Sequence, residues 1–311
     1  MKPLSASFPT IKRDYTSNSD EPFHSGKPQS QFLGSNSSIG TILTDTGRLS
    51  PENADRILRT QIEQGKQFGV TAIELGLLTE DDVQFALSRQ FNNLYLPTGD
   101  NSLDRRLVAA YKPFSPIVEK LRGLRSQLML RWFNAEANQN TLAVVSPGSQ
   151  EGRSFIAANL AIIFSQLGKR TLLIDADLRT PRQHELFKLS GNGGLSSLLA
   201  GRIGMEVIAR IPPLLGLYVL PAGTVPPNPQ ELLGRSRFAE LLHVAMREFD
   251  VVIIDTPAAS QYSETQIIAA RTSAALIVAR KNHTSLEGTV ALVHSLRETG
   301  TASVGTVLNE F

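Results

Sequence analysis

The sequence of 311 residues predicts an α/β fold, with a doubly wound, mostly parallel sheet over residues 141–311 and a small helical repeat domain before it. Two observations support this prediction. Short apolar runs alternate with helical patterns in the C-terminal part, and a 24-residue pattern occurs twice in the N-terminal part. Residues 1–37 are rich in Ser, Pro, Lys and Asn and lack hydrophobic periodicity, which predicts a disordered tail.

The internal repeat occupies residues 38–98, and its two copies are 38–61 and 67–90. At a period of 29 residues the identical pairs are Gly40 and Gly69, Gly47 and Gly76, Leu49 and Leu78, Leu58 and Leu87, and Gln61 and Gln90. Both copies place a capping residue, Ser50 or Thr79, before an acidic turn and a helix. Each copy therefore predicts a short helix, a glycine-terminated turn and a second helix. Two such units can bury their apolar faces against each other.

Residues 99–140 are expected to form a linker and an amphipathic helix opened by Ser115-Pro116. Glu119, Arg122 and Arg125 follow at i, i+3 and i+6, close to one face of that helix. From these residues alone, the expectation is a solvated helix with a local ion pair.

Six apolar runs predict the strands of the sheet. They are TLAVVS (141–146), TLLIDAD (171–177), LYVLPAG (217–223), VVIIDTP (251–257), AALIVAR (274–280) and SVGTVLN (303–309). Their apolarity is continuous rather than alternating, which indicates strands covered on both faces in a parallel sheet. In such a sheet the ligand site is expected at the carboxyl ends of the strands.

The loop SPGSQEGRS follows the first run and leads into a predicted helix. Free N–H groups at a helix N-terminus attract anions, and Gly148 and Gly152 permit the close approach of phosphate. The pattern G-x-x-x-x-G-K-[ST] would place Gly at 147 and Lys at 153, where this chain has Pro147 and Arg153. Ser154 occupies the position of the hydroxyl that binds Mg²⁺.

Carboxylates follow two further runs. Asp175 and Asp177 end the second run, and Asp255 comes after four apolar residues of the fourth. Carboxylates at the end of a buried strand are costly unless a cation pairs with them, and Mg²⁺·ATP supplies such a cation. Together with the loop, these positions predict a site for a phosphate-bearing nucleotide.

Composition excludes several other classes of protein. The chain has no cysteine, and its five histidines lack metal-ligand spacing, which argues against thiol catalysis and a structural zinc site. A net charge of +2 gives no support for nucleic-acid binding. The absence of an apolar run of membrane-spanning length leads us to expect a cytoplasmic protein.

The three strand-end motifs together resemble the bacterial tyrosine kinases (BY-kinases) of exopolysaccharide assembly, within the MinD/ParA-like P-loop ATPases. The segments TLLIDADLRTPR (171–182), GLSSLLAG (194–201) and GTVPPNPQELLGRSRF (223–238) strengthen the resemblance. The EpsG-type chain-length-determinant kinases are similar in carrying Gly152-Arg153-Ser154 in place of Gly-Lys-Ser and a repeat domain in front. The resemblance covers about residues 38–311.

This resemblance implies roles for individual residues. It implies catalytic roles for Arg153, Asp175, Asp177 and Asp255, and Mg²⁺ ligation by Ser154, Asp175 and Asp255. It implies a nucleotide site formed by Gly148, Ser149, Gln150, Glu151, Gly152, Arg153, Ser154 and Phe155, with Asn309 against the adenine. Asp175 and Asp177 would orient the metal and accept the proton of the tyrosine hydroxyl.

The repeat domain is similar to the MshEN-type N-terminal domain of secretion and pilus ATPases, which binds cyclic di-GMP. That family begins each motif with Arg-Leu-Gly, whereas this chain has Ser38-Ile39-Gly40 and Gln67-Phe68-Gly69. Without the two arginines, the cations that would meet the phosphates and guanines are missing. We therefore expect weak binding of cyclic di-GMP, or none.

The implied activity is that of an ATP-dependent protein tyrosine kinase that regulates exopolysaccharide polymerisation, chain length and export. A transmembrane polysaccharide co-polymerase would activate it and hold it at the inner membrane. Glu119, Arg122 and Arg125 reproduce the E-x-x-R-x-x-R pattern by which BY-kinase subunits assemble into rings. The alternatives are a MinD/ParA-like ATPase switch and a nucleotide-responsive scaffold without kinase activity.

The phosphate acceptor is left open by the sequence. BY-kinases usually end in a tyrosine cluster that neighbouring subunits phosphorylate, whereas this chain ends in Asn309-Glu310-Phe311. Its tyrosines are Tyr15, Tyr95, Tyr111, Tyr218 and Tyr262. Phosphorylation of a tail cluster is therefore not expected.

Overall fold

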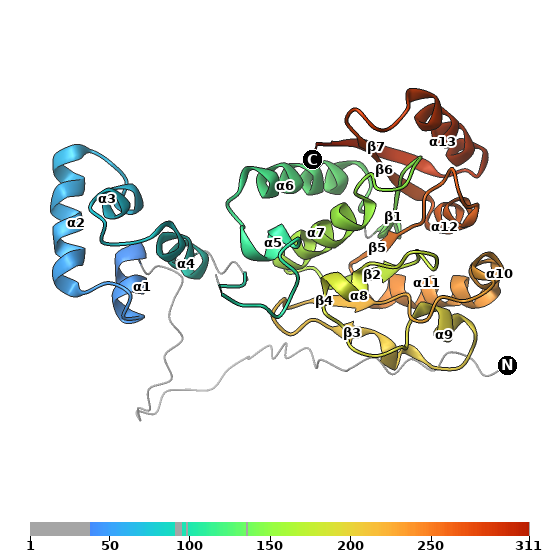
Figure 1. Ribbon diagram of the computed structural model, residues 1–311, viewed down its shortest axis with the longest axis horizontal. Coiled ribbons are helices and arrows are strands. Elements are labelled where there is room, and N and C mark those ends of the chain that lie inside the picture. The colour runs from blue at the N-terminus through green and yellow to red at the C-terminus, as the bar shows by residue number, and fades with distance from the viewer. Residues whose placement is uncertain (1–37, 91–94, 98, 135, 311) are drawn as a thin grey trace, which may run out of the picture. The chain divides into compact units, whose positions relative to one another are not determined.

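The computed structural model describes residues 38–90, 95–97, 99–134 and 136–310, which fall into two compact units (Figure 1). The described part of the smaller unit is 38–90, and that of the larger unit is 95–310. The expected tail, residues 1–37, lies outside the described residues.

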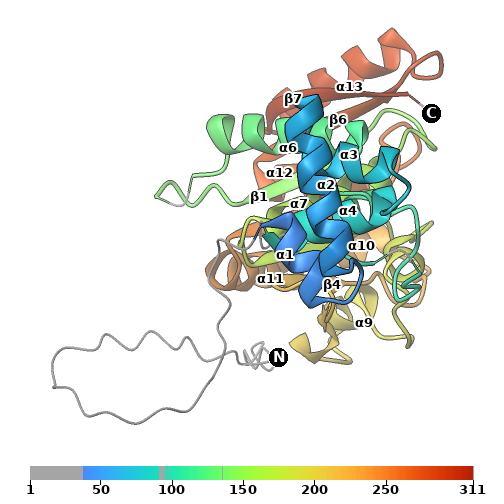
Figure 2. The same ribbon diagram turned by 90° about the vertical axis from the view of Figure 1, so that its left-hand side faces the viewer.

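The smaller unit consists of two helix–turn–helix copies, as the repeat predicts. Its helices are α1 (Ile39–Asp45), α2 (Pro51–Gln64), α3 (Phe68–Glu74) and α4 (Glu80–Gln90), of which α2 is the longest at 14 residues (Figure 2). Gly47 and Gly76 have φ angles of 69° and 66°. Because these left-handed angles are costly for other residues, glycine at both positions ends the first helix of each copy.

Side-chain caps begin the second helix of each copy. The Ser50 hydroxyl accepts the N–H of Asn53 at 3.2 Å. Thr79 and Asp82 form a reciprocal capping box, in which the Thr79 hydroxyl accepts the Asp82 N–H at 3.2 Å and the Asp82 carboxylate accepts the Thr79 N–H at 3.1 Å. Both predicted caps are confirmed.

The core of the smaller unit reflects the repeat. Buried residues include three pairs of equivalent positions, namely Leu43 and Ala72, Leu49 and Leu78, and Ile57 and Ala86. The same repeat position is therefore used for burial in each copy, so the 29-residue period describes the packing as well as the sequence.

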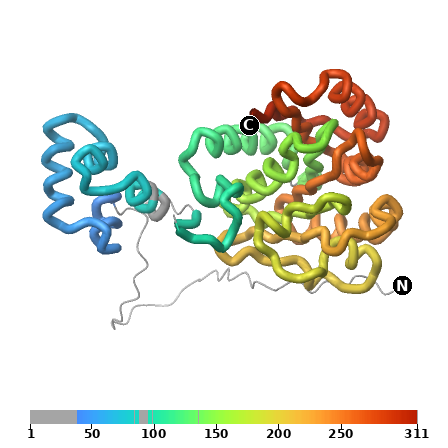
Figure 3. Tube along the Cα trace, viewed as in Figure 1, coloured from blue at the N-terminus to red at the C-terminus, as the bar shows by residue number. Residues whose placement is uncertain are grey.

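The larger unit contains a seven-stranded sheet in the order β3-β4-β2-β5-β1-β6-β7. The strands are β1 (Thr141–Val145), β2 (Thr171–Asp175), β3 (Ala209–Arg210), β4 (Leu217–Leu220), β5 (Val251–Asp255), β6 (Ala274–Arg280) and β7 (Ala302–Asn309). The six predicted strands are confirmed, and they pair in parallel. The sequence did not predict β3, a two-residue antiparallel strand at the edge. Figure 3 traces the unit from β1 in green to β7 in red.

Helices cover both faces of the sheet, as a doubly wound fold requires. They are α5 (Val108–Tyr111), α6 (Pro116–Arg131), α7 (Arg153–Gln166), α8 (Gln183–Leu186), α9 (Leu195–Leu199), α10 (Pro229–Gly234), α11 (Ser236–Glu248), α12 (Glu264–Thr272) and α13 (Leu286–Glu298). Within β1, Leu142 and Val144 join one buried cluster with α6 and α7, while Ala143 and Val145 join another with α11 and α12. Strands buried on both sides explain the continuous apolar runs.

The segments 194–201 and 223–238 meet in the structure. The Ser196 hydroxyl donates to the carbonyl of Thr224 at 2.7 Å, and the N–H of Leu195 donates to the carbonyl of Pro221, just before the second segment, at 2.7 Å. A Cβ atom on Gly194 would collide with the Gly223 backbone. Glycine at 194 is therefore required by this close approach of two backbones.

No helix among the described residues is long and apolar enough to cross a membrane.

Candidate nucleotide-binding site

Two carboxylates from different segments meet at the carboxyl end of the sheet. Asp175 of β2 and Asp255 of β5 are paired in the parallel register, and both side chains are fully buried. The structure therefore brings together two of the predicted metal ligands, 80 positions apart in the sequence, at the edge where parallel sheets place their sites.

Asp175 is held by main-chain donors. Its Oδ1 accepts the N–H of Asp177 at 3.2 Å, and its Oδ2 accepts the N–H groups of Arg182 and Gln183 at 3.0 and 2.9 Å. Burial and the neighbouring Asp255 nonetheless raise the pKa of Asp175 well above its ordinary value. The backbone N–H groups fix this carboxylate in place without offsetting the effect of burial on its pKa.

Asp255 has one oxygen bonded and one free. Its Oδ2 accepts the side-chain amide of Gln183 at 2.8 Å, whereas its buried Oδ1 has no hydrogen-bond partner among the described residues. Burial raises the pKa of Asp255 to about 6, although Ser154, Arg153 and Gln183 lower it.

These oxygens fit a magnesium ion. Asp255 Oδ1 and Gln183 Oε1 are both buried acceptors without a donor, and the two carboxylates repel each other. Mg²⁺ takes oxygen ligands, usually one or two carboxylates together with water and phosphate. A divalent cation would therefore relieve the repulsion between Asp175 and Asp255, with the Ser154 hydroxyl nearby.

Asp177 points its carboxylate into its own loop. Its Oδ1 accepts the N–H groups of Arg179 and Thr180 at 3.1 and 2.8 Å, and its Oδ2 accepts the Thr180 hydroxyl at 3.0 Å. Unlike Asp175, Asp177 lines a cavity in front of the loop at 148–154. Of the two carboxylates that end this segment, Asp177 is therefore the one that borders the cavity, although its side chain is buried.

The loop between β1 and α7 forms despite its departures from the usual pattern. Gly152 has a φ of 99°, and Gln150, a residue with a Cβ, has a φ of 58°. Glu151 is buried and braces the loop, because its carboxylate accepts the Gly148 N–H at 2.9 Å and the Thr284 hydroxyl at 2.6 Å. The Glu151 side chain therefore supports the loop, and a phosphate could meet only its main chain.

Arg153 lies folded against the protein. Its Nε donates to the carbonyl of Thr256 at 2.8 Å, and its Nη1 donates to the Gly148 carbonyl at 2.5 Å and to the Ser146 hydroxyl. The side chain is buried. The planar guanidinium thus binds several acceptors around the loop through its separate N–H donors. A lysine ammonium, which is a single charged point, could not bind them all in the same geometry.

The cavity has a volume of about 430 Å³. Its lining includes Ser149, Gln150, Glu151, Gly152, Arg153, Ser154, Phe155 and Asp177 among the predicted site residues. Gly148, Asp175, Asp255 and Asn309 are not part of the lining. The Asn309 amide donates to the Glu151 carbonyl at 3.1 Å, so Asn309 lies against the loop, and its contact with adenine stays a prediction.

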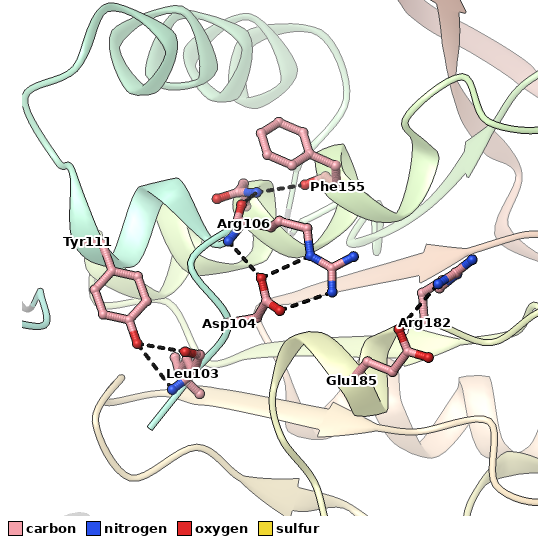
Figure 4. A network of polar contacts seen from close by, with 8 residues as sticks. Leu103, Asp104, Arg106, Tyr111, Phe155, Arg182 and Glu185 are labelled. Carbon is pink, nitrogen blue, oxygen red and sulfur yellow. Dashed lines mark hydrogen bonds and ion pairs between the residues drawn. The ribbon is translucent and has the colours of Figure 1, made fainter. Parts of the chain in front are cut away.

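Sequence reasoning named neither Gln183 nor five of the residues that line the cavity, namely Arg106, Thr180, Arg182, Leu186 and Arg280. Gln183 of α8 connects the Asp255 carboxylate with the Ser154 carbonyl, to which its amide donates at 3.2 Å. Arg106, from the segment before α5, lines the cavity together with Arg182. Both side chains are drawn in Figure 4. The only sequence signal for Gln183 was its place just after TLLIDADLRTPR, and Arg106 had none.

The E-x-x-R-x-x-R residues lie on α6. Glu119 and Arg122 form the local ion pair expected from their spacing, and 60% of the Glu119 side chain is exposed. Arg125 turns inward and donates to the Ile163 carbonyl at 3.4 Å. Burial lowers the pKa of Arg125.

A second cavity, of about 550 Å³, lies within the smaller unit. It is lined by Ser38, Ile39, Gly40, Thr41, Thr44, Asp45, Pro51, Ala54, Asp55, Leu58, Gln61 and Phe68. The lining contains two carboxylates and no lysine or arginine. Its charge is therefore opposite to that which an anionic nucleotide requires.

Comparisons with known proteins identify relatives of the larger unit. The family model described as the CobQ/CobB/MinD/ParA nucleotide binding domain matches residues 142–311. The putative tyrosine-protein kinase CapB of Staphylococcus aureus is 38% identical over 176 residues, which are 56% of this chain and 76% of CapB. A putative tyrosine-protein kinase in the cps region of Klebsiella pneumoniae is 31% identical over 247 residues. The match covers 79% of this chain but only 33% of the Klebsiella protein.

Solved structures have the same architecture. The chimerical protein CapA2B2 aligns with a TM-score of 0.62 at 33% identity, over 74% of this chain and 98% of that one. The kinase domain of Escherichia coli tyrosine kinase ETK aligns with a TM-score of 0.63 at 32% identity, over 66% of this chain and 79% of that one.

Proposed function

The chain belongs to the bacterial tyrosine kinases, within the CobQ/CobB/MinD/ParA nucleotide-binding family, and we propose that it is an ATP-dependent protein tyrosine kinase regulating exopolysaccharide polymerisation, chain length and export. The observation that carries this proposal is the register pairing of Asp175 with Asp255 beside the loop at 148–154. The two carboxylates supply the negative charge that holds the Mg²⁺ of a bound triphosphate, at the edge of the sheet where nucleotides bind.

The roles of the residues follow from their positions. Asp255, Asp175 and the Ser154 hydroxyl would hold Mg²⁺, which when bound neutralises charge on the phosphates. The main-chain N–H groups at the start of α7 would bind the β- and γ-phosphates, because they lie at the positive end of a helix. Arg153 adds a fixed positive charge beneath the loop.

Asp177 is the best placed proton acceptor, because it lines the cavity while Asp175 does not. The tyrosine oxygen would bond to the γ-phosphorus as the bond to the ADP oxygen breaks, and the phenolic proton would pass to Asp177. A phenol has a pKa of about 10, so an acceptor held in position assists as the new bond forms.

The proposed partners follow the same reasoning. A transmembrane polysaccharide co-polymerase would activate the chain and hold it at the inner membrane. Copies of the chain would assemble through Glu119, Arg122 and Arg125, and the exposure of Glu119 supports this assignment.

An assay with γ-labelled ATP tests the proposed activity. The protein is incubated with and without the cytoplasmic segment of the co-polymerase, and label on protein tyrosine is expected. Release of free phosphate without protein label would favour an ATPase switch. Bound but intact ATP would favour a nucleotide-responsive scaffold.

A further inference from the structure

We propose that Arg106 binds the phosphates of the nucleotide, as an additional cationic residue supplied by the segment before α5. The inference rests on the proposed function, since it takes Mg·ATP as the ligand. Arg106 lies outside the strand-end motifs, yet it lines the same cavity as Gly152, Ser154 and Asp177.

The backbone of Arg106 is fixed by the helix that starts at the phosphate loop. Asn159 of α7 is fully buried, and its amide donates to the Arg106 carbonyl at 3.2 Å. The oxygen of the same amide accepts the N–H of Ala109 at 2.9 Å. Because α7 begins at Arg153, one helix positions both the loop and Arg106.

The guanidinium of Arg106 is oriented by Asp104 (Figure 4). Its Nε and Nη2 donate to the two carboxylate oxygens at 2.9 and 3.0 Å, and the Asp104 N–H donates to the Leu186 carbonyl at 2.9 Å. The pair uses one edge of the guanidinium, so the Nη1 edge is left for a second anion. Arginine can bind two anions through two edges in this way, whereas lysine offers a single charged point.

The hydrogen bonds of Arg153 explain why a further cation would help to bind the phosphates. Its guanidinium already donates to the Thr256 carbonyl, the Gly148 carbonyl and the Ser146 hydroxyl. A residue committed to these acceptors is poorly placed to follow the phosphates. Arg106 is 55% exposed at its side chain and lies at the cavity, so it can meet them directly.

The alternative role for Arg106 is an ordinary surface ion pair with Asp104. An exposed pair of this kind contributes little to stability and nothing to ligand binding. Binding measurements therefore distinguish the two roles more clearly than unfolding does.

Calorimetry on the full chain tests the inference with two probes, Mg·ATP and magnesium tripolyphosphate. The variant Arg106→Ala is expected to bind both about tenfold more weakly, as for the loss of one charge-assisted hydrogen bond, while its melting temperature stays close to that of the wild type. The affinity of Arg106→Lys for each probe should lie between the affinities of Arg106→Ala and the wild type. The control Arg105→Ala removes the same charge one residue away, where the guanidinium lies 4.5 Å from the centre of the Tyr111 ring, and should bind like the wild type.

The outcomes separate the inference from the proposed function. Equal binding of Mg·ATP by the wild type and Arg106→Ala would overturn the inference and leave the function standing. An equal loss of affinity in Arg105→Ala would also overturn the inference. A loss of affinity in Arg106→Ala that is seen with Mg·ATP but not with tripolyphosphate would overturn it too, since Arg106 would then contact the nucleoside. A wild-type chain that binds no Mg·ATP would overturn the function and the inference together.

Discussion

Asp175 and Asp255 are register partners on neighbouring parallel strands, with both carboxylates buried at the same level of the sheet. Burial raises the pKa of both carboxylates, and the neighbouring Asp255 raises that of Asp175 further, while the Gln183 amide and main-chain N–H groups donate hydrogen bonds that act in the opposite direction. A site built in this way is under electrostatic strain until a cation arrives, so metal binding and protein stability are linked.

Loss of either carboxylate should stop catalysis without unfolding the chain. Asp175→Ala or Asp255→Ala is expected to abolish Mg²⁺-dependent turnover, because each removes a proposed metal ligand. The measurement is phosphate transfer or release at saturating Mg·ATP, with circular dichroism as the check on folding. Wild-type rates in either variant would show that the site assignment is wrong.

The raised pKa of Asp255 predicts how stability depends on pH. Because the folded-state pKa is about 6 and the ordinary value is 3.8, the folded chain binds this proton more tightly than the unfolded chain does. Without metal, the contribution of Asp255 to stability should therefore be fully present below about pH 4 and should fall as the pH rises to about 6. Removing the charge with Asp255→Asn should stabilise the metal-free protein at pH 7 by up to about 3 kcal/mol.

Urea unfolding in the presence of a chelator checks this pH dependence. The stability difference between Asp255→Asn and the wild type should grow between pH 4 and 6 and then level off, and Mg²⁺ should reduce it. A difference that is the same at every pH would mean that Asp255 does not titrate as described.

Lysine in place of Arg153 is expected to preserve or raise activity. A lysine cannot bind the Thr256 and Gly148 carbonyls through one rigid fork, so its charge is freer to follow the phosphates. Turnover and the affinity for Mg·ATP are measured for Arg153→Lys beside the wild type. If the variant no longer binds nucleotide, the contacts of Arg153 with the loop are needed to form the site.

Gln183 should matter for metal binding although it carries no charge. Gln183→Ala removes the donor to Asp255 Oδ2 and to the Ser154 carbonyl, so turnover is expected to fall by about 10- to 100-fold, as for other residues that orient metal ligands. The half-maximal Mg²⁺ concentration should rise as well. The exposed Gln230→Ala serves as the control. An unchanged Mg²⁺ requirement in Gln183→Ala would contradict this role.

Cyclic di-GMP is expected to bind weakly or not at all to the full chain. The cavity of the smaller unit contains Asp45 and Asp55 and no cationic lining residue. Calorimetry gives the measurement, and restoring the missing cations with Ser38→Arg and Gln67→Arg together should increase the affinity. Tight binding by the wild type would mean that the nucleotide uses contacts other than arginine.

The sequence predicted most of the fold because local patterns determine it. Continuous apolar runs such as 171–177 become strands buried on both faces, and the 29-residue period gives the paired helices of the smaller unit. The edge strand β3 was missed because its two residues, Ala209 and Arg210, are too few to form a pattern.

The site was predicted less completely, because its remaining parts depend on tertiary contacts. Asp175, Asp177, Asp255 and the loop follow strands, and strand ends are visible in a sequence. Gln183 contacts Asp255 across 72 positions, and Arg106 reaches the cavity through Asn159, 53 positions away. Neither spacing follows a helical or strand period, so nothing local indicated either contact.

The core of the smaller unit also distinguishes its two halves. Where the first copy buries Leu43 and Ile57, the second buries Ala72 and Ala86 at the equivalent positions. Large side chains from one half thus share the interior with small ones from the other, and a tandem of two first copies would overfill it. At these two positions the halves are therefore complementary in size.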